Sequence, residues 1–217
     1  DKISKIPNVA KAQLAGSARR MRETIGDLDI VLGANPEYQE DIIREIMSLP
    51  GIAEVKGQGT SKISLILEAE MLADTISNNE MDFALSESLS ERSSNATIDA
   101  QIRIVNPETF PFTLAYFTGS KEHNIRMRQK AIEKGLRLNE FGLFSEKEAG
   151  NKIGMDAAKN TLICNDEAEI YKNLGMAWVP PELREDRGEI EAAIQGNLPK
   201  LIEVNDLKGA FHNHTTA

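Results

Sequence analysis

This chain of 217 residues has a single cysteine, no long apolar run and no excess of positive charge. Its single cysteine, Cys164, has no partner for an internal disulfide and no companion for a zinc cluster. No apolar run reaches the length of a membrane span, and no charged-then-apolar signal opens the chain, so we expect a cytoplasmic protein with no membrane role. With 41% hydrophobic and 27% charged residues, the composition predicts a soluble globular chain of one large or two small domains.

The net charge of −9, taken alone, argues against a protein that binds nucleic acid. Its distribution weakens that argument, because six basic and only two acidic residues lie between Lys121 and Arg137. Most of the acid lies in other parts of the chain and can face away from a bound polyanion. The basic segment is therefore either a solvated helix face or a surface for a nucleic-acid backbone.

Two aspartates mark the most informative part of the sequence. Asp27 and Asp29 alternate with Leu28 and Ile30, which predicts a strand with both carboxylates on one face. Their spacing along that strand is roughly 6.5–7 Å, which suits carboxylates that share Mg²⁺ ions.

A small basic turn precedes these aspartates. Gly16 lets a phosphate approach the backbone, and Ser17 and the following amides can donate hydrogen bonds to it. Arg19, Arg20 and Arg22 add positive charge. A phosphate-binding turn followed by a metal-binding strand is typical of a nucleotidyl transferase.

The remaining pattern alternates strands and helices. We expect a strand that delivers the turn, a helix that ends at Pro50-Gly51, and a basic helix from Lys121 to Lys134 capped by Thr118-Gly119-Ser120. The second half of segment 68–95 is predicted to be a long loop. Further strands are expected at 52–56, 61–67 and 98–105, a hairpin at 136–144, and short helices near 146–152 and 167–174.

Three blocks of the sequence, at 16–32, 102–135 and 180–193, together resemble the palm and thumb of a family X DNA polymerase, the polymerase beta family. The third block looks like the bacterial branch, in which a PHP phosphoesterase domain follows the polymerase. Segment 211–216 is similar to the opening metal motif of that domain. The resemblance implies an α+β fold, a nucleotidyltransferase-type palm with a mixed β-sheet followed by a small, mostly helical thumb. It divides the chain into a palm at 1–117, a thumb at 118–195, and a linker with the start of a truncated PHP domain at 196–217.

The resemblance also implies a role for individual residues. Residues that would bind the incoming dNTP are Gly16, Ser17, Arg20 and the amide of Gly26 at the phosphates, Tyr116, Phe117, Thr118 and Gly119 at the sugar, and Asn124 at the minor-groove edge of the base. Asp27 and Asp29 would ligate Mg²⁺ or Mn²⁺, and Arg126 and Arg128 would contact DNA. Without that resemblance, Tyr116, Phe117, Asn124 and Arg128 have plain alternatives as core or as a polar helix face.

The sequence departs from the family at the third metal-binding carboxylate. Fifteen residues before Tyr116 the family has an aspartate, whereas this chain has Gln101. In a two-metal scheme that aspartate helps to activate the primer 3′-hydroxyl, so a neutral amide predicts a weaker second metal. Asp99 lies one strand repeat earlier and replaces it only through a register shift or a bulge.

These observations predict a monomeric DNA polymerase that transfers a nucleotide from dNTP to a primer 3′-end in gap repair and is impaired by Gln101. The alternative is a catalytically degenerate palm and thumb that serves as a DNA- or nucleotide-binding scaffold for an adjoining PHP phosphoesterase. A transferase acting on a small molecule or RNA shares the first block, but the helix with Asn124 and Arg128 argues against it.

Overall fold

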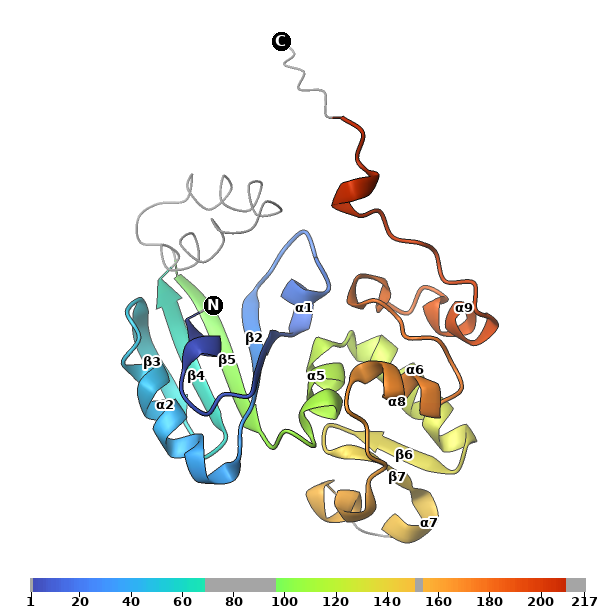
Figure 1. Cartoon of the computed structure of the whole chain (residues 1–217), viewed down its shortest axis with the longest axis horizontal. Coiled ribbons are helices and arrows are strands. Elements are labelled where there is room, and N and C mark those ends of the chain that lie inside the picture. Colours follow the sequence, from blue (N-terminus) through green and yellow to red (C-terminus); the bar gives the residue numbers. More distant parts are fainter. Residues whose placement is uncertain (1, 69–96, 151–153, 210–217) are drawn as a thin grey trace.

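The protein has two lobes, a sheet lobe and a mostly helical lobe (Figure 1). The computed structural model describes residues 2–68, 97–150 and 154–209. Two regions discussed above, most of segment 68–95 and the motif at 211–216, lie outside the described residues. Within those described ranges, no helix has the length and apolar character needed to span a bilayer.

The sheet lobe comes first in the chain. Its elements are η1 (Ile3–Lys5), β1 (Lys11–Leu14), α1 (Gly16–Arg19), β2 (Asp27–Gly33), η2 (Pro36–Tyr38), α2 (Gln39–Met47), β3 (Ile52–Gln58), β4 (Lys62–Glu68) and β5 (Thr97–Val105). The five strands form one mixed sheet in the order β1-β2-β5-β4-β3. Strands β2 and β5 are parallel, and the other neighbours are antiparallel.

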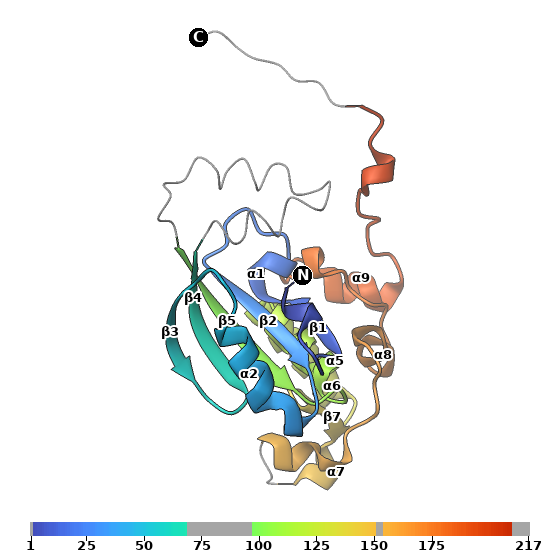
Figure 2. The same ribbon diagram turned by 60° about the vertical axis from the view of Figure 1, so that its left-hand side comes forward.

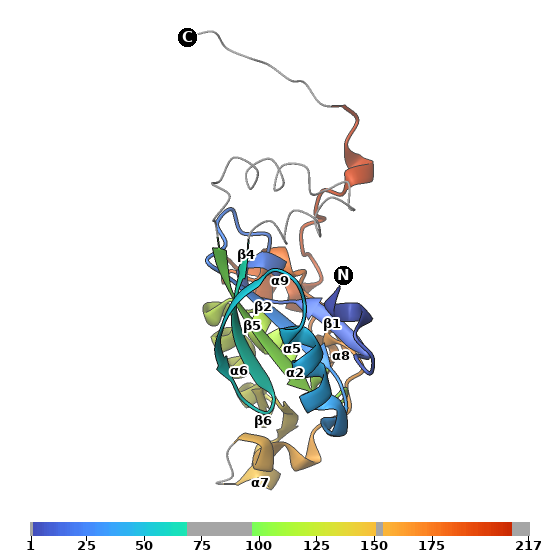
Figure 3. The same ribbon diagram turned by 90° about the vertical axis from the view of Figure 1, so that its left-hand side faces the viewer.

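Alternation along the strands decides which face of the sheet is buried. Ala100, Ile102 and Ile104 of β5 are buried in the main core, whereas Asp99 and Gln101 are on the opposite face. Helix α2 covers the buried face (Figure 3), and its three buried isoleucines belong to the same core. Each of these side chains stabilises the fold by about 1.5–3 kcal/mol through removal from water. The opposite face of the sheet is therefore left free to carry polar side chains.

The helical lobe contains a second core. Its elements are α5 (Phe110–Thr118), α6 (Lys121–Glu133), β6 (Leu136–Asn139), β7 (Gly142–Ser145), α7 (Glu146–Ala149), η3 (Gly154–Asn160), α8 (Glu167–Asn173), η4 (Pro181–Leu183), α9 (Glu189–Gln195) and η5 (Val204–Asp206). Ser120 caps α6 by accepting the backbone N–H of His123, and Gly135 adopts a positive φ of 69° just after the helix. The predicted strands, hairpins and basic helix are confirmed, with boundaries shifted by a few residues.

Helix α5 belongs to both lobes. Phe110 and Leu114 pack with Ala15 and Val31 of the sheet lobe, whereas Phe112 is part of the core of the helical lobe. Because its side chains divide between two cores, α5 fixes the position of one lobe against the other.

A buried ion network reinforces this junction. Arg19 of α1 donates two hydrogen bonds to the carboxylate of Glu167, at 3.0 and 2.5 Å, and Arg184 donates to the same carboxylate at 2.7 Å. Burial by itself would raise the pKa of Glu167, but the two guanidinium groups outweigh it and hold that pKa below its ordinary value. Glu167 is therefore an anion shared by two cations from separate parts of the chain.

We predict that Glu167→Gln destabilises the protein by about 3–5 kcal/mol, because two buried guanidinium groups lose their shared anion. Urea denaturation followed by circular dichroism measures this loss. The matched control is Asp41→Asn, which removes the carboxylate from an exposed pair with Arg44 and is expected to cost less than about 1 kcal/mol. Equal losses in the two variants would contradict the structural role of Glu167.

Candidate active site

The candidate site lies on the polar face of the sheet, where β2 and β5 run side by side. The parallel register places Asp29 directly opposite Gln101, and Asp27 directly opposite Asp99. Neighbouring strands lie about 4.8 Å apart, so these four side chains form two adjacent rows on one face. The predicted shared face of Asp27, Asp29 and Gln101 agrees with this arrangement.

The carboxyl group of Asp29 is electrostatically unfavourable as an isolated anion. Burial raises its pKa above the ordinary value, and the neighbouring charge of Asp27 raises it further. Arg103, Lys62 and Arg20 act in the opposite direction without cancelling the increase. A divalent cation shared with Asp27 would relieve both the burial and the like-charge repulsion.

The donor set suits Mg²⁺ held together with a substrate. Mg²⁺ in proteins is commonly bound through one or two carboxylates while phosphate and water oxygens complete its octahedron. Asp27 and Asp29 provide two carboxylates, and Gln101 adds only an amide oxygen beside them. In the described residues, no group of three or more Asp, Glu, His or Cys side chains is placed to hold a metal ion.

Asp99 does not occupy the place of Gln101. Strands β2 and β5 pair without interruption from Asp27–Asp99 to Gly33–Val105, so no register shift moves Asp99 toward Asp29. Its carboxylate instead forms an ion pair with Lys56, which projects from β3. Gln101 is therefore the residue beside Asp29, and Asp99 lies one row further along.

Gly16 permits the basic turn at residues 16–22, hereafter the phosphate turn, to lie against this site. It has φ of +60°, and a Cβ atom at this position would lie 2.5 Å from Oδ2 of Asp29. Any larger residue would displace the carboxylate or the turn. The backbone amide of Ala15 also donates to the carbonyl of Asp29 at 2.7 Å, which ties the turn to β2. Ser17 follows in the half-buried first turn of α1, and Gly26 is exposed at the start of β2.

The arginines of the turn have different partners. Arg19 points into the ion network with Glu167 and also donates to Thr118 Oγ1 at 2.6 Å. Arg20 donates to the carbonyl of Thr118 at 2.6 Å and to the carboxylate of Glu185 at 2.8 Å. Arg22 lies 3.7 Å from that same carboxylate. Arg20 and Arg22 thus form the cationic side of the site, while Arg19 holds the lobes together.

Helix α5 of the helical lobe lies against α1 of the sheet lobe, and Figure 2 shows the two lobes from a second side. Phe117 stacks against Arg103, with the guanidinium carbon 3.9 Å from the ring centroid, and Tyr116 meets Phe117 edge to face. Gly119 lies so close to Arg20 that an added Cβ would be 3.1 Å from its Nη1 atom. The end of α5 and the phosphate turn are therefore in direct contact.

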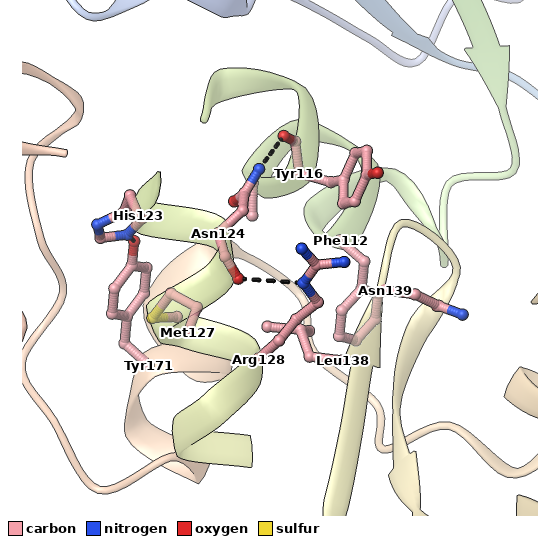
Figure 4. A pocket seen from close by; sticks show the side chains of 10 residues that line it. Phe112, Tyr116, His123, Asn124, Met127, Arg128, Leu138, Asn139 and Tyr171 are labelled. Carbon is pink, nitrogen blue, oxygen red and sulfur yellow. Dashed lines mark hydrogen bonds between the residues drawn. The ribbon is translucent and has the colours of Figure 1, made fainter. Parts of the chain in front are cut away.

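A pocket lies beside the end of α5 (Figure 4). Tyr116, Asn124 and Arg128 line it together with apolar side chains of α5, α6 and β6. The amide of Asn124 donates to the carbonyl of Tyr116 at 2.6 Å, and Nε of Arg128 donates to the carbonyl of Asn124 at 3.3 Å. The predicted minor-groove residue and one predicted DNA contact thus share one opening.

The two predicted DNA-contacting arginines differ in their surroundings. Arg128 is exposed, and its Nε donates to the Asn124 carbonyl. Arg126 forms an ion pair with Glu191 and lies 3.6 Å from the carboxylate of Asp186. The positive charge of Arg126 is therefore already balanced by acids of the helical lobe.

Sequence reasoning missed the acids that pair with these arginines and with His123. Glu167, Glu185 and Glu189 belong to the acidic part of the chain that was expected to face away from a bound polyanion. Instead, Glu167 and Glu189 are buried, and Glu185 touches the phosphate turn. The proximity of Glu185 to the Pro180-Pro181 block was the only local signal, and it did not specify a partner.

Comparisons with known proteins agree with this geometry. Residues 113–185 match the DNA polymerase beta thumb family. The DNA polymerase/3′-5′ exonuclease PolX of Bacillus subtilis (strain 168) is 32% identical over 214 residues, which are 99% of this chain and 31% of that protein. DNA polymerase lambda of Arabidopsis thaliana is 28% identical over 171 residues, 78% of this chain and again 31% of the relative. This chain thus spans about a third of the length of these curated relatives.

The fold also has a solved counterpart. A crystal structure of Leishmania infantum polymerase beta, a ternary P/T complex, covers 81% of this chain with a TM-score of 0.61 and 24% sequence identity, and the match covers 67% of that chain. This likeness shows that the two chains share a fold. The match along 99% of the sequence, together with the thumb-family match at residues 113–185, shows that this chain belongs to the family X DNA polymerases and comprises their palm and thumb.

Proposed function

We propose that the chain performs template-directed nucleotidyl transfer from a dNTP to a primer 3′-end, as in the repair of gapped DNA, and that Gln101 makes this reaction slow. The observation that carries the proposal is the contact between the Gly16 turn and Asp29, which places a phosphate-binding backbone against a carboxylate pair. Such a juxtaposition suits a triphosphate whose oxygens share a cation with the protein.

Each residue has a defined part in this proposal. Asp27 and Asp29 hold Mg²⁺ or Mn²⁺, which when bound neutralises the triphosphate and supports the displacement of pyrophosphate. The Gly16 and Gly26 backbone, Ser17 and Arg20 bind the phosphates, and the Tyr116–Gly119 segment shapes the sugar site. Asn124 faces the minor-groove edge of the new base. DNA lies along α6, with contacts from Arg128 and from Arg126.

Gln101 decides how well this arrangement works. An aspartate beside Asp29 would help to bind a cation at the primer 3′-hydroxyl and so lower the pKa of that hydroxyl, whereas the amide of Gln101 brings no charge. Positioning of the dNTP is preserved, but activation of the attacking oxygen is weakened. The same observation favours a second candidate function, a degenerate palm and thumb that binds DNA or nucleotide as a scaffold for an adjoining PHP phosphoesterase.

The first test concerns the nucleotide site. Asp29→Ala is expected to weaken Mg²⁺-dependent dATP binding by about 10–100-fold or more, because a direct ligand matters at least as much as its supporting shell. Isothermal titration calorimetry measures the change. Asp99→Ala is the matched control, since it removes a carboxylate from the adjacent row that is paired with Lys56. Binding that survives in Asp29→Ala, or none in the unaltered protein at millimolar dATP, would refute the site.

The second test addresses the missing carboxylate. Gln101→Asp is expected to speed primer extension on gapped DNA by about 100-fold or more, the size of effect seen for preorganised catalytic charges. Gln101→Asn, which has the same length as aspartate but no charge, should give no such gain. A folded Gln101→Asp without improved extension would favour the scaffold function. Rapid extension by the unaltered protein that Asp99→Ala abolishes would assign the third position to Asp99.

The third test places the DNA. Arg128→Ala should weaken binding to gapped DNA and reduce the dependence of log affinity on log salt by about one unit, because one phosphate contact is lost. Arg126→Ala should reduce this slope less, since its charge is already balanced by Glu191 and Asp186. Fluorescence anisotropy at several salt concentrations gives both slopes. Equal slopes in both variants and the unaltered protein would exclude a DNA path along α6.

A further inference from the structure

The helical lobe contains a buried hydrogen-bonded triad that the proposed reaction does not use. His123 of α6 lies between Glu189 of α9 and Tyr171 of α8, with Nδ1 at 2.7 Å from Glu189 Oε1 and Nε2 at 2.9 Å from the Tyr171 hydroxyl. The side chains of His123 and Glu189 are only 2% and 4% exposed. His123 and Tyr171 also line the pocket beside the end of α5, but each residue as a whole is only 1% exposed. The cluster joins α6, α8 and α9, so it can fix these three helices relative to one another.

The protonation state of the triad follows from its surroundings. Burial acts to raise the pKa of Glu189, but hydrogen bonds from His123 and from backbone amides outweigh it and lower that pKa to about 2. Burial also lowers the pKa of His123, and the positive charge of Arg184 adds to this effect, although Glu189 and Asp186 oppose it. At neutral pH the imidazole is therefore neutral, with Nδ1–H donating to the Glu189 carboxylate and Nε2 accepting from Tyr171.

The carboxylate of Glu189 also accepts hydrogen bonds from the backbone of a neighbouring loop. It accepts the backbone N–H groups of Asp186 at 3.0 Å and Arg187 at 2.7 Å. The other end of this loop is fixed by Ser120, whose backbone N–H donates to the carbonyl of Arg184 at 2.9 Å. Residues 184–187, hereafter the clamp loop, are thus anchored on one side to the start of α6 and on the other to Glu189, the partner of His123.

Glu185 lies between these anchors and points at the phosphate turn. Its carboxylate accepts from Arg20 Nε at 2.8 Å, and Arg22 lies 3.7 Å away. Both Arg20 and Glu185 are largely shielded, with 14% and 19% of their side chains exposed, so solvent screens the pair only partly. A triphosphate at the turn would meet an arginine whose charge is already matched by an acid of the other lobe.

We infer that the buried His123–Glu189 pair is a positioning device for the phosphate turn: it fixes the clamp loop, holds Glu185 against Arg20, and so limits the positive charge offered to a triphosphate. This inference rests on the proposed function, because it assigns the triphosphate of the dNTP to the same turn. In this inference His123 acts on the phosphate turn through Glu189 and the clamp loop. Nucleotide binding then requires that phosphate replace Glu185 as the partner of Arg20.

The experiment is a double-mutant cycle read by calorimetric titration with dATP and Mg²⁺. Glu185→Gln should tighten dATP binding by about fivefold, the lower end of typical coupling between sites. His123→Phe removes the Nδ1–H donor, frees the clamp loop and should tighten binding to a similar extent. The double variant should bind no more tightly than either single variant, because both changes release the same arginine.

Two controls separate this device from general effects of charge and packing. Glu182→Gln removes an exposed acid three residues before Glu185 and should leave dATP affinity unchanged. His123→Asn retains an amide donor close to the position of Nδ1 and should restore the affinity of the unaltered protein. If His123→Phe does not fold, Glu189→Gln replaces it in the cycle, because it keeps the side-chain shape and removes the anion.

A second measurement does not depend on nucleotide binding. Hydrogen exchange should show that the amides of Asp186 and Arg187 lose protection in His123→Phe and keep it in His123→Asn, whereas amides of α2 are unchanged in both. Retained protection in His123→Phe, or a gain in dATP affinity that adds fully to that of Glu185→Gln, would overturn the inference. Absence of dATP binding in the unaltered protein would instead refute the proposed function, and hydrogen exchange would still decide whether His123 fixes the clamp loop.

Discussion

The site depends above all on the parallel pairing of β2 with β5. Because this register is continuous, it decides that Asp29 has Gln101 beside it and that Asp27 has Asp99 beside it. A shift of one residue would turn Asp27 and Asp29 into the core and bring Leu28 and Ile30 to the polar face. The packing of α2 on the buried face is therefore also what keeps the carboxylates exposed to a substrate.

The phosphate turn contributes both to the contact between the lobes and to the proposed nucleotide site. Arg19 donates hydrogen bonds to the carboxylate of Glu167. Arg20 donates to the carbonyl of Thr118 and to the carboxylate of Glu185. Arg19, the last residue of the four-residue helix α1, thus holds the lobes together, and the next residue, Arg20, faces the proposed nucleotide. A change in the angle between the lobes would alter the partners of Arg20, so under the proposed function this contact would couple nucleotide affinity to lobe position.

Local patterns predicted the strands, the hairpins and the capped helix α6, because alternation, helix caps and glycine turns act over a few residues. They also placed Asp27 and Asp29 on one face, since strand periodicity fixes that relation, whereas the place of Gln101 beside them was expected from the resemblance to the family. They did not predict that Glu167, Glu185 and Glu189 would pair with Arg19, Arg20 and His123. Each of these contacts joins residues far apart in the chain. The sequence of an acidic segment does not distinguish carboxylates that face water from carboxylates that pair with a distant cation.

The charges around Asp29 make Gln101 more than a missing ligand. On the polar face of the sheet, Asp27 and Asp29 lie close together. The positive charges of Arg20, Lys62 and Arg103 are near enough to oppose, in part, the increase in the pKa of Asp29. With an aspartate at position 101, these basic residues would be balanced by three carboxylates. In this chain they are balanced by Asp27 and Asp29 alone, because the amide of Gln101 is neutral. A cation at Asp27 and Asp29 therefore gains less from its surroundings than it would with a third anion present. In the proposed two-metal site, the loss of one charge would therefore weaken both metal positions, and the second position more than the first.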